Sequence, residues 1–315
     1  MTRYVMQRLV ALIPVMLIVA TVGFAIIHLA PGDPAAVMLG LDATPERVQE
    51  LRRELGLDRP LPVQLARWYG RILRGDLGRS IFEQDPVVQV IRSRLEPSLL
   101  LTAMGVGLAV LMGVPAGVIS AVRRNTVVDQ VLMGGALLGV SVPSFWLGLN
   151  LILVFSLRLN LFPTSGYVPL GEAWMGTLRT LALPAMTLGI LGSGFIARMT
   201  RSAMLEVLLM DYVRTARAKG LKEPRVILRH AFRNGLIPVV TIVGIVVGTL
   251  MAGGVITVET VFAIPGVGLL VISSILRRDF PVIQGVLLYV SIVYVLINLL
   301  VDLLYVFLDP RVKYA

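Results

Sequence analysis

The residue types that most often carry catalysis or bind metals are scarce in this sequence of 315 residues. There is no cysteine, which excludes disulfides and thiolate metal ligands, and the two histidines, His28 and His230, lie far apart. None of the lysines lies in a G-x-x-x-x-G-K-[ST] loop, the pattern that cradles nucleotide phosphates. No Ser/His/Asp or paired-carboxylate arrangement is present in the apolar segments. We therefore expect no enzyme activity and no cofactor held by this chain.

One basic segment is suited to binding rather than to catalysis. The string DYVRTARAKGL (211–221) predicts a short amphipathic helix that stops at Gly220, and a second helix is expected to begin near Pro224. Two helices separated by a glycine turn make a compact protrusion. The small residues Ala216 and Ala218 then give it a smooth surface that can fit into a groove. The alternative is a basic loop that lies against lipid headgroups.

The elements around this segment follow from the distribution of charge. The chain is 56% hydrophobic and only 15% charged, whereas a soluble domain has about 25% charged residues. Six stretches without formal charge are each near or above the ~18–20 residues that cross a bilayer. Backbone groups in lipid must be paired within the segment, so helices are expected and the fold class is an all-α integral membrane protein with six transmembrane helices. These stretches are 9–32, 97–122, 130–157, 180–197, 234–258 and 280–301.

Two further features affect the expected number of transmembrane helices. The stretch 260–276 contains Pro265 and Gly266, and we interpret it as a re-entrant or interfacial turn. The first stretch could be a cleaved signal peptide, because Arg3 and Arg8 precede it. Its apolar run is longer than a normal signal-peptide core and no A-x-A site follows, so a membrane span is favoured.

Basic residues predict the orientation of these spans. Segment 198–236 has nine Lys or Arg and three acidic residues, whereas segment 33–96 has ten of each sign. The positive-inside rule therefore places 198–236 and both termini in the cytoplasm and 33–96 outside. The net charge of +10 is then mainly an orientation signal. Nucleic-acid binding is not expected, since no aromatic-interleaved basic patch accompanies the charge.

The exterior segment is predicted to contain two short helices. One begins at Pro45, is capped by Thr44 and ends at Gly56, and the second covers 64–70 and ends near Gly75. This segment is either a solvated connection or a small subdomain that meets a partner. We therefore divide the chain into 1–96, the first transmembrane helix with the exterior subdomain, and 97–315, a core of five helices with the cytoplasmic loop 198–236.

The spans offer little to couple transport to an ion gradient. Ion-coupled carriers place carboxylates inside the membrane, but here Asp302 only follows the last charge-free stretch. The chain also has no phosphate loop for nucleotide hydrolysis. If the chain transports a solute, the energy is expected to come from another subunit. A self-contained channel or secondary carrier, and an assembly scaffold, stay open as alternatives.

The segment Arg214-Thr215-Ala216-x-x-x-Gly220 resembles the E-A-A-x-x-x-G loop of ABC importer permeases, with Arg214 and Thr215 departing from it. Together with RHAFRNGLIPVVT (229–241), it is similar to the dipeptide/oligopeptide/nickel permease family, in the subunit with the long first exterior loop. Further matching strings cover nearly the whole chain: LAPGDPA (29–35), LGLDRPL (55–61), GDLGRSI (75–81), VPSFWLGL (142–149), LPAMTLG (183–189), VETVFAIPGVGLL (258–270), RDFPVIQG (278–285) and YVFLDPRVKY (305–314).

The resemblance implies a type I ABC importer permease in a bacterial or archaeal cytoplasmic (inner) membrane. Such a permease pairs with a second permease subunit, docks on two cytoplasmic ATPase subunits that bind ATP and Mg²⁺, and receives its solute from an extracytoplasmic substrate-binding protein. The family carries dipeptides, longer peptides, glutathione, nickel chelates and some sugars, and the sequence does not select among them. The docking residues implied are Asp211, Arg214, Thr215, Ala216, Arg217, Ala218, Lys219 and Gly220.

Overall fold

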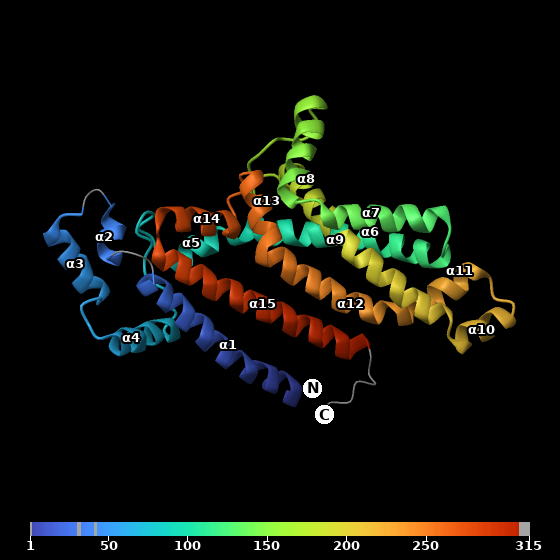
Figure 1. Ribbon diagram of the computed structural model, residues 1–315, viewed down its shortest axis with the longest axis horizontal. Helices are drawn as coiled ribbons and strands as arrows, with labels where there is room; N and C mark the ends of the chain where they lie inside the picture. Colours follow the sequence, from blue (N-terminus) through green and yellow to red (C-terminus); the bar gives the residue numbers. More distant parts are fainter. Residues whose placement is uncertain (1, 30–32, 41–42, 309–315) are drawn as a thin grey trace. The chain divides into compact units, whose positions relative to one another are not determined.

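The computed structural model describes residues 2–29, 33–40 and 43–308 (Figure 1). The regular elements within these residues are helices, and the only strand-like pairing among them is an isolated bridge between Arg79 and Pro86. The chain divides into two compact units. Unit 1 consists of Met1–Glu96 and Gly266–Val295, and unit 2 consists of Pro97–Pro265 and Leu296–Ala315. The division at residues 1–96 and 97–315 that we expect from the sequence stays a prediction.

Unit 1 contains the first helix, the helices of the predicted exterior segment and two helices from the last part of the chain. The sequence signals for α3 are confirmed, because the Thr44 hydroxyl accepts a hydrogen bond from the Arg47 amide and Gly56 ends the helix at a φ of 68°. The second predicted helix is α4, which begins three residues earlier than expected. The helices of unit 1 are α1 (Thr2–Leu29), α2 (Pro34–Leu39), α3 (Pro45–Leu55), α4 (Leu61–Leu73), α5 (Val87–Ser93), α14 (Val267–Arg277) and the first part of α15 (Phe280–Leu308).

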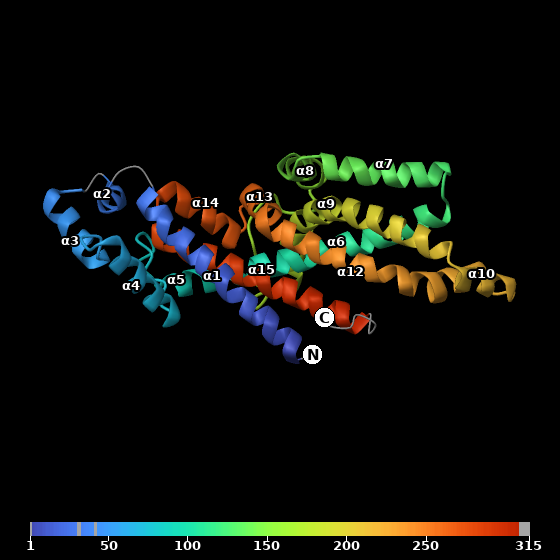
Figure 2. The same ribbon diagram turned by 60° about the horizontal axis from the view of Figure 1, so that its bottom comes forward.

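Unit 2 is a bundle in which α6, α7, α9 and α12 run side by side, with α10 at one end (Figures 1 and 2). Its buried centre is apolar and includes Leu101, Leu181, Leu188 and Phe262. The helices of unit 2 are α6 (Leu95–Val122), α7 (Val127–Ser141), α8 (Ser144–Leu151), η2 (Ile152–Arg158), α9 (Trp174–Leu208), α10 (Asp211–Ala218), α11 (Glu223–Arg225), η3 (Val226–Ala231), α12 (Phe232–Thr249), η4 (Leu250–Gly254) and α13 (Val255–Val261).

Small residues allow two of these helices to approach closely. A Cβ atom at Gly117 of α6 would lie 2.5 Å from the carbonyl oxygen of Ala197 in α9, and one at Gly113 would lie 2.7 Å from that of Ser193. Gly113 and Gly117 lie four residues apart, which is the small-xxx-small spacing that lets helix backbones approach closely. At Gly135 of α7, in contrast, an added Cβ would meet nothing within 4 Å.

The described residues contain three helices that are long and apolar enough to cross a membrane, or up to five if each of two bent pairs counts as one span. The three are α6, α9 and the Phe280–Leu300 part of α15. One bent pair corresponds to the predicted span 130–157. We expect a single helix there, but α7 and the segment Ser144–Arg158 meet at 104°. The break lies at Pro143, which has no amide hydrogen, and Val142 before it is extended, with ψ at 130°.

The remaining predicted spans are described in part. Within α1, residues Ile13–Leu29 form an apolar helix, whereas 30–32 lie outside the described residues. The predicted span 234–258 corresponds to α12, η4 and the start of α13. In the stretch 260–276, the expected turn is followed by an apolar helix, α14, of 11 residues. That helix is about 16 Å long and so is shorter than a ~30 Å bilayer core.

Candidate functional site

The basic segment forms a helical hairpin, which we define as residues 211–231. Its first arm is α10 and its second arm begins with α11, where Pro224 occupies the first turn as expected. Gly220 makes the turn at a φ of 74°, in the left-handed region that glycine tolerates best. The predicted helix, stop and second helix are thus confirmed. The assignment of this hairpin as a docking element stays a prediction.

The inner face of the hairpin packs on the end of α9. Val213 and Ala216 of α10 are buried in a cluster with Met204 of α9 and with Val226 and Ala231 of η3. The side chain of Ala216 is only 6% exposed. Our expectation that Ala216 contributes to the outer surface is therefore wrong, because the 3.6-residue period turns it inward together with Val213.

The outer face of the hairpin is polar and mostly basic. Arg217 pairs with Glu223 across the turn at 2.7 Å between Nε and Oε1, and Arg214 lies 3.6 Å from Asp211. The Asn234 amide, in the first turn of α12, donates a 2.8 Å hydrogen bond to the Tyr212 hydroxyl and so joins α10 to the helix that follows the hairpin. The predicted docking residues that this exposed face presents are Asp211, Arg214, Thr215, Arg217, Ala218, Lys219 and Gly220.

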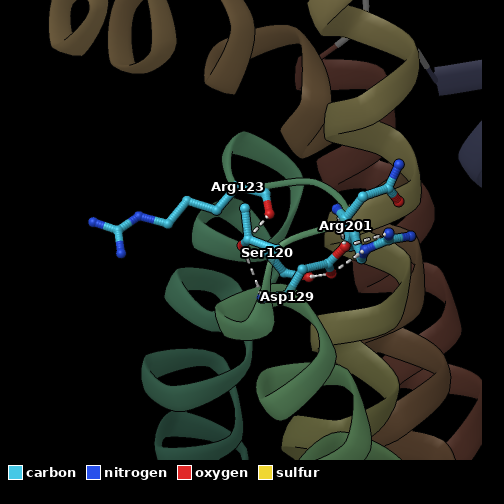
Figure 3. A network of polar contacts seen from close by, with 6 residues as sticks. Ser120, Arg123, Asp129 and Arg201 are labelled. Carbon is cyan, nitrogen blue, oxygen red and sulfur yellow. Dashed lines mark hydrogen bonds and ion pairs between the residues drawn. The ribbon is translucent and has the colours of Figure 1, made fainter.

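A buried ion pair lies in the same unit, between α9 and the α6–α7 turn (Figure 3). The Asp129 carboxylate accepts hydrogen bonds from Nε and Nη2 of Arg201, both at 2.8 Å. It also accepts from the Ser120 hydroxyl and, at 2.9 Å, from the Asn125 amide. The Asp129 side chain is 6% exposed and that of Arg201 is 27% exposed. This bidentate geometry fixes the end of α6 and the start of α7 to α9.

The amino-acid sequence alone did not reveal this ion pair. Arg201 counts there only as one of nine basic residues, and Asp129 only marks the boundary of an apolar stretch. It also did not identify Glu259 of α13, which is fully buried and accepts a 2.6 Å hydrogen bond from the Ser98 hydroxyl of α6. One available signal is that Glu259 interrupts a charge-free stretch of more than forty residues, since a charge in such a position needs a partner.

Another buried carboxylate lies in unit 1. Asp279, directly before α15, accepts a 2.6 Å hydrogen bond from the Ser80 hydroxyl and a 3.2 Å hydrogen bond from the Ile81 amide. These hydrogen bonds fix the loop between α4 and α5, within the predicted exterior segment, to the turn between α14 and α15. Together, the three carboxylates have partners within the described chain that suit structural roles. The exposed basic hairpin, in contrast, has a surface available to a partner.

Helical bundles with this arrangement occur among solved transporters. The structure matches one chain of an inward-facing structure of the MetNI methionine ABC transporter with a TM-score of 0.58. The match covers 70% of this chain and 97% of that chain at 19% sequence identity. The two chains therefore share a fold.

Sequence comparisons define the family. The model of the binding-protein-dependent transport system inner membrane component matches residues 113–314, and the model of its N-terminal part matches residues 1–102. The chain belongs to this family of inner membrane components. It is accordingly a multi-pass permease subunit of an importer in the inner membrane, and it works with other components of an ABC transporter.

Curated relatives match over the full length of the chain. A protein of Brucella abortus (strain 2308) that carries the name of a peptide transport system permease is 46% identical over 314 residues, which cover 100% of both chains. The glutathione transport system permease protein GsiC of Pectobacterium atrosepticum is 43% identical, again with 100% of both chains covered.

Proposed function

We propose that this chain forms one half of the translocation path of a peptide importer and that ATP hydrolysis elsewhere drives it through the hairpin 211–231. In this proposal the chain crosses the membrane six times and both termini are cytoplasmic. A second, related permease forms the other half of the path. Two cytoplasmic ATPase subunits bind ATP and Mg²⁺, and an extracytoplasmic substrate-binding protein delivers the solute.

The observation that carries the proposal is the construction of the hairpin. Its inner face is anchored to α9 through Val213 and Ala216, while its outer face is exposed and basic. A protrusion that is rigid at its base and open at its tip is suited to dock on a partner and to pass on its movement. A flexible loop against lipid headgroups would need neither the buried contacts of Val213 and Ala216 nor the ion pair between Arg217 and Glu223.

Substitutions in the exposed tip test the docking role. Ala218→Trp adds bulk to an exposed position of α10, and Arg214→Glu reverses a charge there. We expect both variants to insert into the membrane normally and to lose most ATP-driven uptake in the reconstituted complex. Arg47→Glu, on exposed α3, is the matched control and should keep normal uptake. Normal uptake by Ala218→Trp and Arg214→Glu would contradict the docking role.

The substrate class is tested separately. The full-length relatives are named for peptide and glutathione transport, and glutathione is itself a tripeptide. We therefore expect the complete complex to take up a radiolabelled dipeptide or tripeptide in an ATP-dependent manner. Uptake by vesicles that contain this chain alone, without ATPase subunits, would contradict the importer proposal and favour a self-contained channel or carrier.

A further inference from the structure

Unit 1 contains a cavity of about 870 Å³ that is lined by residues outside the hairpin 211–231. Its lining includes apolar residues that we call the floor, namely Phe24 and Ile27 of α1 and the buried Trp68 of α4. It also includes three exposed arginines that we call the rim, namely Arg67 and Arg71 of α4 and Arg74 directly after it. The lining is thus apolar in part and cationic in part.

The positive charge at this rim is not balanced by the protein. Among the described residues that line the cavity, Glu54 is the only carboxylate, whereas Arg79 adds a fourth guanidinium. Within the described part of the chain, none of the four arginines forms an ion pair. The guanidinium of Arg71 instead lies 5.8 Å from the centre of the Trp68 ring. Several unpaired guanidinium groups around one opening favour an anionic ligand.

The position of α4 indicates where that ligand comes from. Trp68 Nε1 donates a 3.0 Å hydrogen bond to the carbonyl oxygen of Ala20, and the Tyr69 hydroxyl donates one of 3.0 Å to that of Leu17. Both carbonyls belong to the apolar stretch of α1 that we expect inside the membrane. At its two ends, α4 also exposes apolar side chains, with Leu61 at 56% and Leu73 at 87%.

An amphipathic helix that carries Trp, Tyr and Arg beside a membrane span has the features of an interfacial helix. Tryptophan and tyrosine side chains favour contact with the membrane interface, and long arginine side chains reach from an apolar surface to polar groups. A lipid beside α1 would meet the residues that line the cavity, which include Phe24 and Ile27 of α1. A free anion from solution would use the guanidinium groups but would leave the apolar floor around Phe24 and Ile27 uncovered.

We propose that this cavity binds an anionic phospholipid, with the phosphate on the arginines of α4 and an acyl chain along the apolar floor. A phospholipid and a free phosphate ion would make the same contact with the guanidinium groups. Only the phospholipid would also place an acyl chain in the cavity. The site is separate from the hairpin 211–231, so its test does not depend on the docking proposal.

Two variants of the full chain, each purified within its complex, test the site from different sides. The first replaces Arg67, Arg71 and Arg74 by Gln and removes the charge of the rim. The second is Gly70→Leu, which fills the cavity without changing charge, because an added Cβ at Gly70 meets nothing within 4 Å. The control replaces the exposed residues Arg47, Arg53 and Arg59, which do not line the cavity, by Gln.

Native mass spectrometry in detergent then measures the retention of added phosphatidylglycerol and phosphatidylcholine. We expect the unmodified complex and the control to retain phosphatidylglycerol preferentially. Both cavity variants should retain at least about tenfold less of it, because one removes the charges that attract the phosphate and the other fills the space for the acyl chain. Three results would overturn the proposal: no preference for phosphatidylglycerol, equal losses in the cavity variants and the control, or complete displacement of the lipid by millimolar inorganic phosphate. The last result would identify a site for a free anion.

Discussion

Asp129 and Arg201 differ in how each would respond to the loss of the other. Asp129 is almost fully enclosed, whereas about a quarter of the Arg201 side chain reaches solvent. An arginine without its partner can therefore turn toward water, but the carboxylate cannot. Removing one member of a buried ion pair costs most when the charge that is left behind stays buried.

We therefore expect Arg201→Gln to destabilise the protein by about 3 kcal/mol, and Asp129→Asn to destabilise it less. The measurement is thermal unfolding of the purified protein in detergent. Arg123→Gln is the control, because the Arg123 guanidinium points away from the network (Figure 3) and its side chain is exposed. Equal unfolding temperatures for Arg201→Gln and Arg123→Gln would contradict the structural role of the ion pair.

The hydrogen bond between Ser98 and Glu259 gives a second prediction for single residues. Ser98→Ala removes a donor from a carboxylate that has no access to water, so we expect a destabilisation of about 1–3 kcal/mol. Ser93→Ala is the matched control, because the Ser93 hydroxyl only donates to the Val90 carbonyl oxygen of its own helix. If both variants unfold at the same temperature, the contact with Glu259 contributes little.

Among the elements, the contact between α6 and α9 depends on the lack of a side chain at a few positions. Gly117→Ala would place a Cβ 2.5 Å from the Ala197 carbonyl oxygen, so the helices would have to separate. We expect a loss of about 1–3 kcal/mol, as for other overpacked cores. Gly107→Ala in the same helix meets nothing within 4 Å and should be neutral or stabilising by up to about 1 kcal/mol. The measurement is the thermal unfolding of both variants in the same detergent. Similar unfolding temperatures for Gly117→Ala and Gly107→Ala would contradict the close packing of α6 on α9.

Local signals predicted several element boundaries well. Thr44, Gly56, Gly220 and Pro224 each act on the backbone within a few residues, so their effects can be recognised without the rest of the fold. The break at Pro143 could not be placed from charge-free stretches, because the hydropathy of a segment does not show whether its helix is straight or bent. Ala216 shares a helix face with Val213, but the burial of this face depends on its packing against Met204 of α9. The ion pair between Asp129 and Arg201 joins residues that are 72 positions apart, which a single sequence does not bring together.

At the scale of the whole molecule, the absence of cysteine makes the predicted topology directly testable. Single cysteines can replace the exposed residues Arg53 in α3 and Ala218 in α10. In intact cells, a membrane-impermeant maleimide should label Arg53→Cys and should leave Ala218→Cys unlabelled until the membrane is opened. Labelling of Ala218→Cys in intact cells would contradict the proposed orientation. The unmodified chain is the blank for both measurements.

The attachment of the hairpin to α9 also has a mechanical consequence. Helix α9 has 35 residues and is therefore about 50 Å long, and only Leu209 and Met210 separate it from α10. The buried contacts of Val213 and Ala216 with Met204 and its neighbours add a second connection beside the covalent one. A force on the tip of the hairpin would consequently act on α9 as a torque. The ion pair between Arg201 and Asp129 lies close to the C-terminal end of α9, where that force is applied. A tilt of a few degrees there becomes a displacement of several ångströms at the far end of α9.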